Sequence, residues 1–229
     1  MINTKNEISS ETVKEYGFRA GANVVGIAAS KDFGSAPEGF TPSVHLEGCC
    51  SVIVLGIPSP EEVLTMSTGD YTDNRNEMLS KMTNIAKEVE KRIKKDGYKA
   101  KAISASGGKF IEGKHFGHIS LKHAAELAGL GVINRNYLLT NQQFGNLLWL
   151  SAVLTDAELV PDKTAQHKTC DKCNKCVEIC PTGALDNPNL FGNKKCDKFY
   201  KIVNGKLEIE CFLCRKICPN RFGSQANRN

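Results

Sequence analysis

Apolar residues in the first 160 positions follow two different periods. Runs that are apolar throughout predict buried strands, whereas apolar residues at every third or fourth position predict helices packed on one side. The clearest helical stripe consists of Met78, Met82, Ile85, Val89 and Ile93. Together the patterns predict strands at 23–28, 51–57, 99–104 and 147–154, and helices capped by Ser10, at 74–95 and at 120–130. The interleaved strands and helices indicate a mixed α/β (α+β) fold.

A polar stretch at 157–169, which contains Pro161, follows the last of these strands. The composition changes there, because most cysteines come after it. We therefore predict an α/β domain at 1–160 and a smaller domain at 161–229.

Eight of the ten cysteines lie between Cys170 and Cys218. The N-terminus is polar and unlike a signal peptide, and no apolar run is long enough to span a membrane. We therefore expect a cytoplasmic protein without membrane association, in which clustered cysteines bind metal rather than form disulfides. Cys49 and Cys50 stand apart at the start of a predicted strand. We expect them to pack as small apolar residues, with a redox or ligand role as the alternative.

The first cysteine motif is Cys170-x-x-Cys173-x-x-Cys176-x-x-x-Cys180-Pro181. This is the bacterial ferredoxin spacing, in which three cysteines hold one 4Fe–4S cluster and the fourth reaches a second cluster. Zinc is the alternative, because Cys-x-x-Cys pairs also occur in zinc ribbons, but it does not explain why both motifs end in Cys-Pro.

The second motif, Cys211-x-x-Cys214-x-x-x-Cys218-Pro219, lacks a nearby first cysteine. Asn204-Gly205 between alternating apolar residues predicts a hairpin, which would bring Cys196 beside Cys211. Exchange of the fourth ligands then predicts the two sets. One cluster takes Cys170, Cys173, Cys176 and Cys218, and the other takes Cys180, Cys196, Cys211 and Cys214.

The formal net charge of +5 treats every cysteine as neutral. A 4Fe–4S core held by four thiolates carries about −2, so two clusters would bring the chain to about +1. The excess of basic residues is therefore weak evidence for a nucleic-acid partner. We interpret the lysines near the clusters mainly as a solvated face that offsets cluster charge.

The segment at 106–118 is rich in glycine and histidine, and its pattern does not assign it to a helix or a strand. Histidine titrates near neutral pH, so His115 and His118 are candidate proton donors, with an inert surface loop as the alternative.

Several segments together resemble the epoxyqueuosine reductase family, which is related to reductive dehalogenases. They are Ala128-Gly129-Leu130-Gly131, Asn136-Tyr137-Leu138-Leu139, Val153-Leu154-Thr155-Asp156 and the two cysteine motifs. The resemblance implies a nitroreductase-like domain followed by a ferredoxin-like domain with two 4Fe–4S clusters. It also implies a bound cobalamin that receives electrons from the clusters, and a tRNA substrate.

By the same resemblance, Gly129, Gly131, Asn134 and Arg135 are expected to bind the cofactor. The family has Gly-Lys where this chain has Asn134-Arg135, and an acidic proton donor near the place where His115 stands. We therefore expect a different substrate, with tRNA left open as a partner.

These observations predict an iron–sulfur oxidoreductase that receives electrons from a redox partner protein and reduces a ligand in its first domain. That domain would hold a corrinoid or a flavin. The alternative is a ferredoxin-type electron carrier without a catalytic site.

Overall fold

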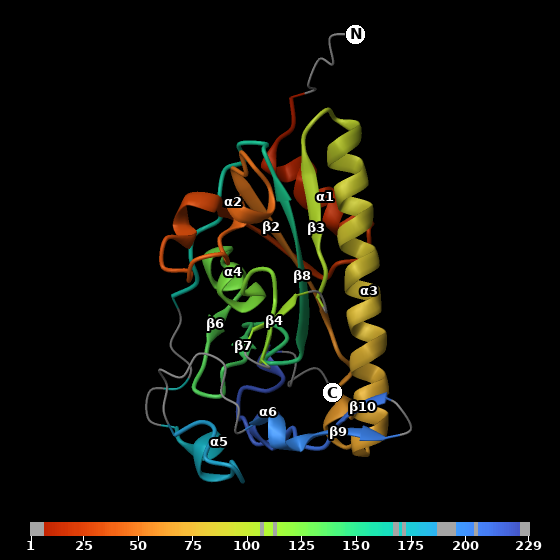
Figure 1. The fold of residues 1–229 in the computed structure, drawn as a ribbon, viewed down its shortest axis with the longest axis vertical. Coiled ribbons are helices and arrows are strands. Elements are labelled where there is room, and N and C mark those ends of the chain that lie inside the picture. The colour runs from red at the N-terminus through yellow and green to blue at the C-terminus, as the bar shows by residue number, and fades with distance from the viewer. Residues whose placement is uncertain are drawn as a thin grey trace.

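The computed structural model describes residues 7–224, apart from 106–107, 112–113, 167–169, 171–172, 187–195 and 204–205. Its centre is an antiparallel sheet with the order β1 (Val24–Ala29), β2 (Ser51–Pro58), β8 (Leu148–Thr155) and β3 (Ala100–Ile103). Helices α1 (Ser10–Arg19) and α3 (Thr68–Lys95) lie on one face, and α4 (Leu121–Leu127) lies on the other (Figure 1). We call residues 7–166 the α/β body.

Strand β2 has apolar side chains on both faces because both faces are covered. Ile53 and Leu55 pack with the α1 and α3 residues, while Val52 and Val54 pack with the α4 residues. All four are fully buried. This arrangement explains why the strand is an uninterrupted apolar run rather than an alternating one.

The remaining cysteine segment, residues 170–224, lies below the α/β body in Figure 1. It contains α5 (Lys175–Glu178), β9 (Tyr200–Val203), β10 (Lys206–Ile209), α6 (Leu213–Lys216) and a 3₁₀ turn at Cys196–Phe199. The smaller elements of the α/β body are α2 (Pro42–His45), β4 (Lys109–Ile111), β5 (Lys114–Phe116), β6 (Val132–Ile133), β7 (Leu139–Thr140) and 3₁₀ turns at Ser30–Phe33 and Glu61–Leu64.

The predicted strands and the mixed α/β class are confirmed, but two helix starts were wrong. Ser9, not Ser10, caps α1, because its hydroxyl accepts a hydrogen bond from the Thr12 amide. Helix α3 begins at Thr68 rather than 74, since Ser67 caps it. The apolar stripe starts only at Met78, so the polar first turns gave no periodic signal. No described helix is both long enough and apolar enough to cross a membrane.

The polar stretch expected to separate two domains is bound to the α/β body. The Asp162 carboxylate accepts a hydrogen bond from the Ile27 amide (2.8 Å) and pairs with Lys14 (2.5 Å). Ser10 exchanges two hydrogen bonds with the backbone of Val160. Residues 157–166 therefore pack with the α/β body, and the division at 160/161 stays a prediction.

Gly26 allows α4 to pack closely on the sheet. A methyl group at Gly26 would overlap the Ala128 carbonyl oxygen and lie 3.0 Å from Leu130. We expect Gly26→Ala to lower the unfolding free energy by about 1–3 kcal/mol, as overpacked sites do. Guanidinium unfolding measures this difference. The control is Gly34→Ala, whose new methyl would meet its nearest neighbour at 4.0 Å. An equal effect in both variants would contradict the packing argument.

Candidate iron–sulfur and ligand sites

Four cysteines from two separate motifs line one small cavity. Cys170, Cys173 and Cys176 come from the first motif and Cys218 from the second, and Asn136 of the α/β body completes the wall. The described structure thus brings together the four cysteines predicted to hold one cluster. Burial, reinforced by Cys170, raises the pKa of the Cys176 thiol. Burial also raises the pKa of Cys218, with Cys170 and Cys173 acting in the same direction.

Three of the second predicted set interact around Cys214. Burial, with the neighbouring Cys196 and Cys211, raises the pKa of Cys214 to about 11, while Arg215 opposes the shift. The predicted antiparallel pairing is confirmed, since Val203 of β9 pairs with Lys206 of β10, while Asn204 and Gly205 lie outside the described residues. The described contact of Cys180 is with Thr182 at 3.7 Å, so its place in this set stays a prediction.

The two sets lie close to each other, because Cys176 of the first also acts electrostatically on Cys214. No three histidine, cysteine or acidic side chains among the described residues converge as a single metal ion requires. The sulfurs around a 4Fe–4S cube need not converge in that way, because each binds a different iron. Four thiols spread around a cavity are the donor set that such a cube uses.

The N-terminal turns of α3 hold the second set against the α/β body. The Thr72 hydroxyl accepts a hydrogen bond from the Ile209 amide, and the Thr68 hydroxyl donates to Glu208. The Tyr71 ring, which is buried, stacks on Phe212 with centroids 4.1 Å apart. Phe212 lies between Cys211 and Cys214 in sequence, so this stack positions the loop that carries both thiols. Tyr71 therefore has a packing role.

The first set is held by a backbone-to-backbone contact between residues 142–146 and 220–224. The Asn146 amide donates to the Arg221 carbonyl (3.0 Å), and the Ser224 amide donates to that of Gln142 (2.8 Å). Gly145 and Gly223 both have positive φ, and a methyl at either would overlap the facing backbone. These contacts place Cys218 beside the first motif.

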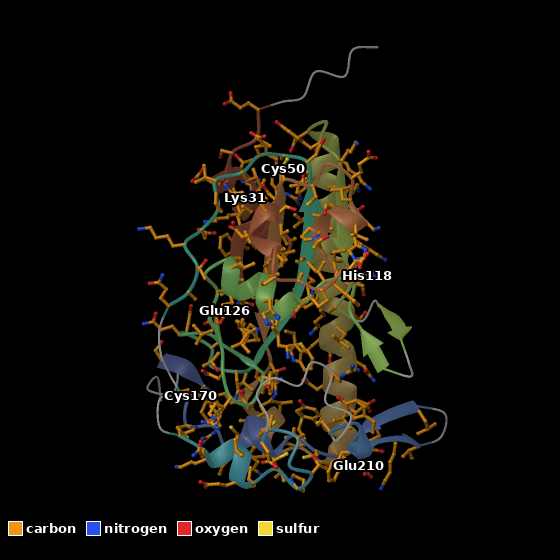
Figure 2. All side chains as sticks on the ribbon, turned by 60° about the vertical axis from the view of Figure 1, so that its left-hand side comes forward. Lys31, Cys50, His118, Glu126, Cys170 and Glu210 are labelled. Carbon is orange, nitrogen blue, oxygen red and sulfur yellow. The ribbon has the colours of Figure 1, made fainter. Side chains whose placement is uncertain are left out.

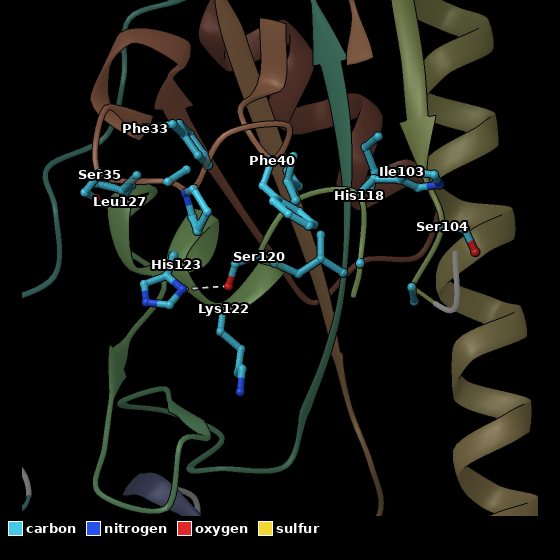
Figure 3. A pocket seen from close by; sticks show the side chains of 16 residues that line it. Phe33, Ser35, Phe40, Ile103, Ser104, His118, Ser120, Lys122, His123 and Leu127 are labelled. Carbon is cyan, nitrogen blue, oxygen red and sulfur yellow. Dashed lines mark hydrogen bonds between the residues drawn. The ribbon is translucent and has the colours of Figure 1, made fainter. Parts of the chain in front are cut away.

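A separate cavity of about 540 Å³ lies in the α/β body between α4 and the chain around Phe33 to Phe40 (Figure 3). Its apolar wall includes Phe33, Phe40, Ile103, Ile119, Leu121 and Leu127, and its polar residues include His118, Ser120, Lys122 and His123. A mostly apolar cavity with a few polar groups is the usual form of a small-molecule site.

Of the two candidate proton donors, His118 lines this cavity. Its carbonyl oxygen accepts a hydrogen bond from His45 Nε2 (2.6 Å), and the two rings meet edge to face at 5.1 Å. The backbone of His115 pairs with Phe110 in the β4–β5 hairpin, but its side chain lies outside the described part of the structure. His123 is exposed and its Nδ1 is 2.6 Å from the Ser120 hydroxyl.

None of the four predicted cofactor residues appears among the described residues that line the cavity. The backbone at Gly129 packs on that of Lys163, and Gly131 packs on Thr140. The Asn134 side chain is buried and donates to the Thr140 hydroxyl, whereas Arg135 is exposed. Their described contacts are structural, and a role in cofactor binding stays a prediction.

Cys49 and Cys50 are separate from both sites. Figure 2 shows Cys50 and Cys170 at opposite ends of the molecule. Cys49 packs against the core on the α4 side of the sheet, and burial raises the pKa of its thiol. Both cysteines are partly buried, and the expectation of a small packed residue fits Cys49, which contacts this core.

Sequence reasoning missed the residues that connect the sites. Lys122, Asn136, Asn146 and Arg215 are all polar and lie near the cysteines. Asn136, Asn146 and Arg215 are buried and Lys122 is partly buried. These positions depend on contacts between segments distant in sequence, so no short pattern distinguishes the four residues.

Comparison with known proteins agrees with this geometry. A family model described as a 4Fe-4S binding domain matches residues 167–186. The chain resembles epoxyqueuosine reductases and reductive dehalogenases. The epoxyqueuosine reductase of Bacillus cereus is 31% identical over 118 residues, which are 47% of this chain and 31% of the relative. The aligned part thus spans about a third of that relative's length.

Two solved structures show the same fold over nearly the whole chain. An epoxyqueuosine reductase bound to a modified tRNA stem loop aligns with a TM-score of 0.63 and 22% identity, covering 92% of this chain and 64% of its own. A reductive dehalogenase structure, whose description concerns B12-dependent dehalogenation, aligns with a TM-score of 0.73 and 21% identity. It covers 98% of this chain and 34% of the dehalogenase.

The Tyr71–Phe212 stack can be tested directly. We expect Tyr71→Ala to lower the unfolding free energy by about 3–5 kcal/mol, because it removes a buried ring. It should also speed amide hydrogen exchange at Ile209, whose amide is bound by the adjacent Thr72. Tyr71→Phe keeps the ring and is the control. Slow exchange at Ile209 in both variants would show that the stack does not hold this loop.

Proposed function

We propose that this chain is an iron–sulfur oxidoreductase that holds two 4Fe–4S clusters in the cysteine segment and delivers electrons to a ligand in the α/β body. The observation that carries the proposal is the cavity lined by Cys170, Cys173, Cys176 and Cys218. The remaining four thiols, Cys180, Cys196, Cys211 and Cys214, would hold the second cluster. When bound, such clusters exchange single electrons with a partner.

The 540 Å³ cavity is the proposed reduction site. Its wall is mostly apolar, and Lys122 belongs both to its lining and to the surroundings of Cys214. A ligand in this cavity would therefore lie on the side of the α/β body that faces the cysteine segment.

The size of the cavity limits the organic cofactor. Sites for drug-sized ligands measure roughly 300–1,000 Å³, and a flavin ring system falls within that size. A corrinoid is several times larger than a drug-like molecule, so the described walls do not enclose a whole one. A corrinoid would need space beyond this cavity, whereas a flavin or a small substrate would fit it.

The relatives suggest binding partners for this chain but do not identify them. The epoxyqueuosine reductase structure contains a tRNA stem loop, and the reductive dehalogenase structure concerns B12-dependent chemistry. This chain differs from the epoxyqueuosine reductase pattern at Asn134-Arg135 and near His115, so we propose a substrate other than the modified tRNA base. A redox partner protein would supply the electrons.

A ferredoxin-type electron carrier is the second candidate. It is favoured by the family model, which matches the cysteine segment and no part of the α/β body. A carrier needs no organic ligand, so the content of the 540 Å³ cavity distinguishes the two functions.

Protein purified without oxygen should contain about eight irons and eight sulfides per chain, and the visible spectrum should bleach with dithionite. Flavin or cobalt in the same preparation, or bound after reconstitution, would support the oxidoreductase. Full iron without either would favour the carrier, and zinc in place of iron would refute both.

Cysteine variants test the ligand assignment. We expect Cys170→Ser and Cys214→Ser each to lose up to about four irons, because each removes one ligand of a different cluster. Cys50→Ser, at the opposite end of the molecule, is the matched control and should keep the full iron content. Loss of iron in Cys50→Ser, or none in the other two, would contradict the assignment.

His118 is proposed to donate a proton to the bound ligand, because it lines the cavity. With an electron acceptor found by screening, His118→Ala should slow reduction by roughly 10²–10⁴-fold. An equal loss in His123→Ala, which removes the other described histidine that lines the cavity, would contradict the assignment to His118. An unchanged rate in the His115→Ala, His118→Ala double variant would exclude both histidines as proton donors.

A further inference from the structure

Two cations lie near Cys214, of which Arg215 is buried and Lys122 is partly buried. Lys122 donates a hydrogen bond to the Tyr137 carbonyl oxygen at 2.5 Å. The Arg215 side chain is 8% exposed, donates to the Asn146 carbonyl oxygen and lies over the Trp149 ring at 5.5 Å. Among the described residues, no carboxylate forms an ion pair with either one.

A buried cation without an anionic partner is costly, and two that repel each other are more so. Burial lowers the pKa of Lys122, Arg215 lowers it further, and Cys214 acts in the opposite direction. Besides the Tyr137 carbonyl, which accepts its hydrogen bond, the described group that favours the charge of Lys122 is a proposed cluster ligand.

The direction of the Lys122 side chain agrees with a position near Cys214. Figure 3 shows Lys122 pointing away from the other labelled side chains of the cavity, although its helix forms part of the wall. Its partner Tyr137 follows Asn136, which donates a hydrogen bond to the Cys214 carbonyl. The ammonium thus lies on the boundary between the 540 Å³ cavity and the cysteine segment.

We propose that the ammonium of Lys122 raises the reduction potential of the cluster bound by Cys214. An electron shared by the two clusters would then favour this cluster, on the side facing the cavity. The inference rests on the proposed function. One added electron takes a cube with four thiolates from about −2 to about −3. A fixed cation stabilises the more negative state more strongly, and burial leaves that attraction poorly screened.

A purely structural role for Lys122 predicts that loss of its charge leaves the reduction potential unchanged. The ammonium could simply hold the Tyr137 carbonyl, whose residue has a positive φ of 56°. Lys122→Gln separates the two roles, because the amide can still donate a hydrogen bond but carries no charge. Lys122→Arg keeps the charge and changes the shape.

The test is a dithionite titration of the intact holoprotein, followed by electron paramagnetic resonance, with iron counted in each sample. The signal absent from Cys214→Ser identifies the relevant cluster. At the wild-type midpoint potential, we expect the reduced-to-oxidised ratio of that cluster in Lys122→Gln to fall about tenfold, which is about 59 mV for one electron. Lys122→Arg should stay close to wild type.

Lys91→Met is the matched control, since Lys91 is exposed near the end of α3 that lies away from the cysteine segment (Figure 1). Lys122→Met, which keeps the length of the apolar stem, provides the same test if the glutamine variant does not fold. Full iron with an unchanged potential in a neutral variant would overturn the proposal, as would an equal shift in Lys122→Arg. Wild-type protein that binds no iron would instead refute the proposed function.

Discussion

The close approach of two backbones at Gly145 and Gly223 is the contact on which the cysteine arrangement depends. It fixes residues 220–224 against the loop at 142–146, and Cys218 lies directly before that segment. The other three thiols of its cavity come from a stretch more than forty residues earlier in the chain. Larger side chains at the two glycines would separate the backbones, and the fourth thiol would leave the cavity.

The cysteine segment has little apolar core of its own. Its described helices are single turns, and its Ile209, Phe212 and Phe222 pack against a cluster of the α/β body that includes Tyr71 and Leu147. Small segments of this kind gain stability from metal binding, because ligand binding and folding are coupled. Docking to α3 and cluster binding should therefore support each other, and the two parts of the chain are not independent units in energetic terms.

The sequence could predict features whose cause is local. The strand at Ser51 to Ile57 is a continuous apolar run, and the hairpin follows from Asn204-Gly205. It could not predict that α3 starts at Thr68, because those first turns are polar and are stabilised by contacts with β10. The cavity and the burial of Lys122 depend on segments distant in sequence, so no short pattern encodes them.

The arrangement of charges near Cys214 also depends on contacts between segments that are distant in sequence. Lys122 is supplied by α4 of the α/β body, and Arg215 by the cysteine segment itself. Lys122 approaches Cys214 only when the two parts are docked, whereas Arg215 follows Cys214 directly in the chain. A buried charge without a partner of opposite sign is costly. Anionic clusters would offset that cost, while the cations would offset the repulsion between two clusters held side by side. The docked, cluster-bound state is thus the one in which every one of these charges has a partner of opposite sign.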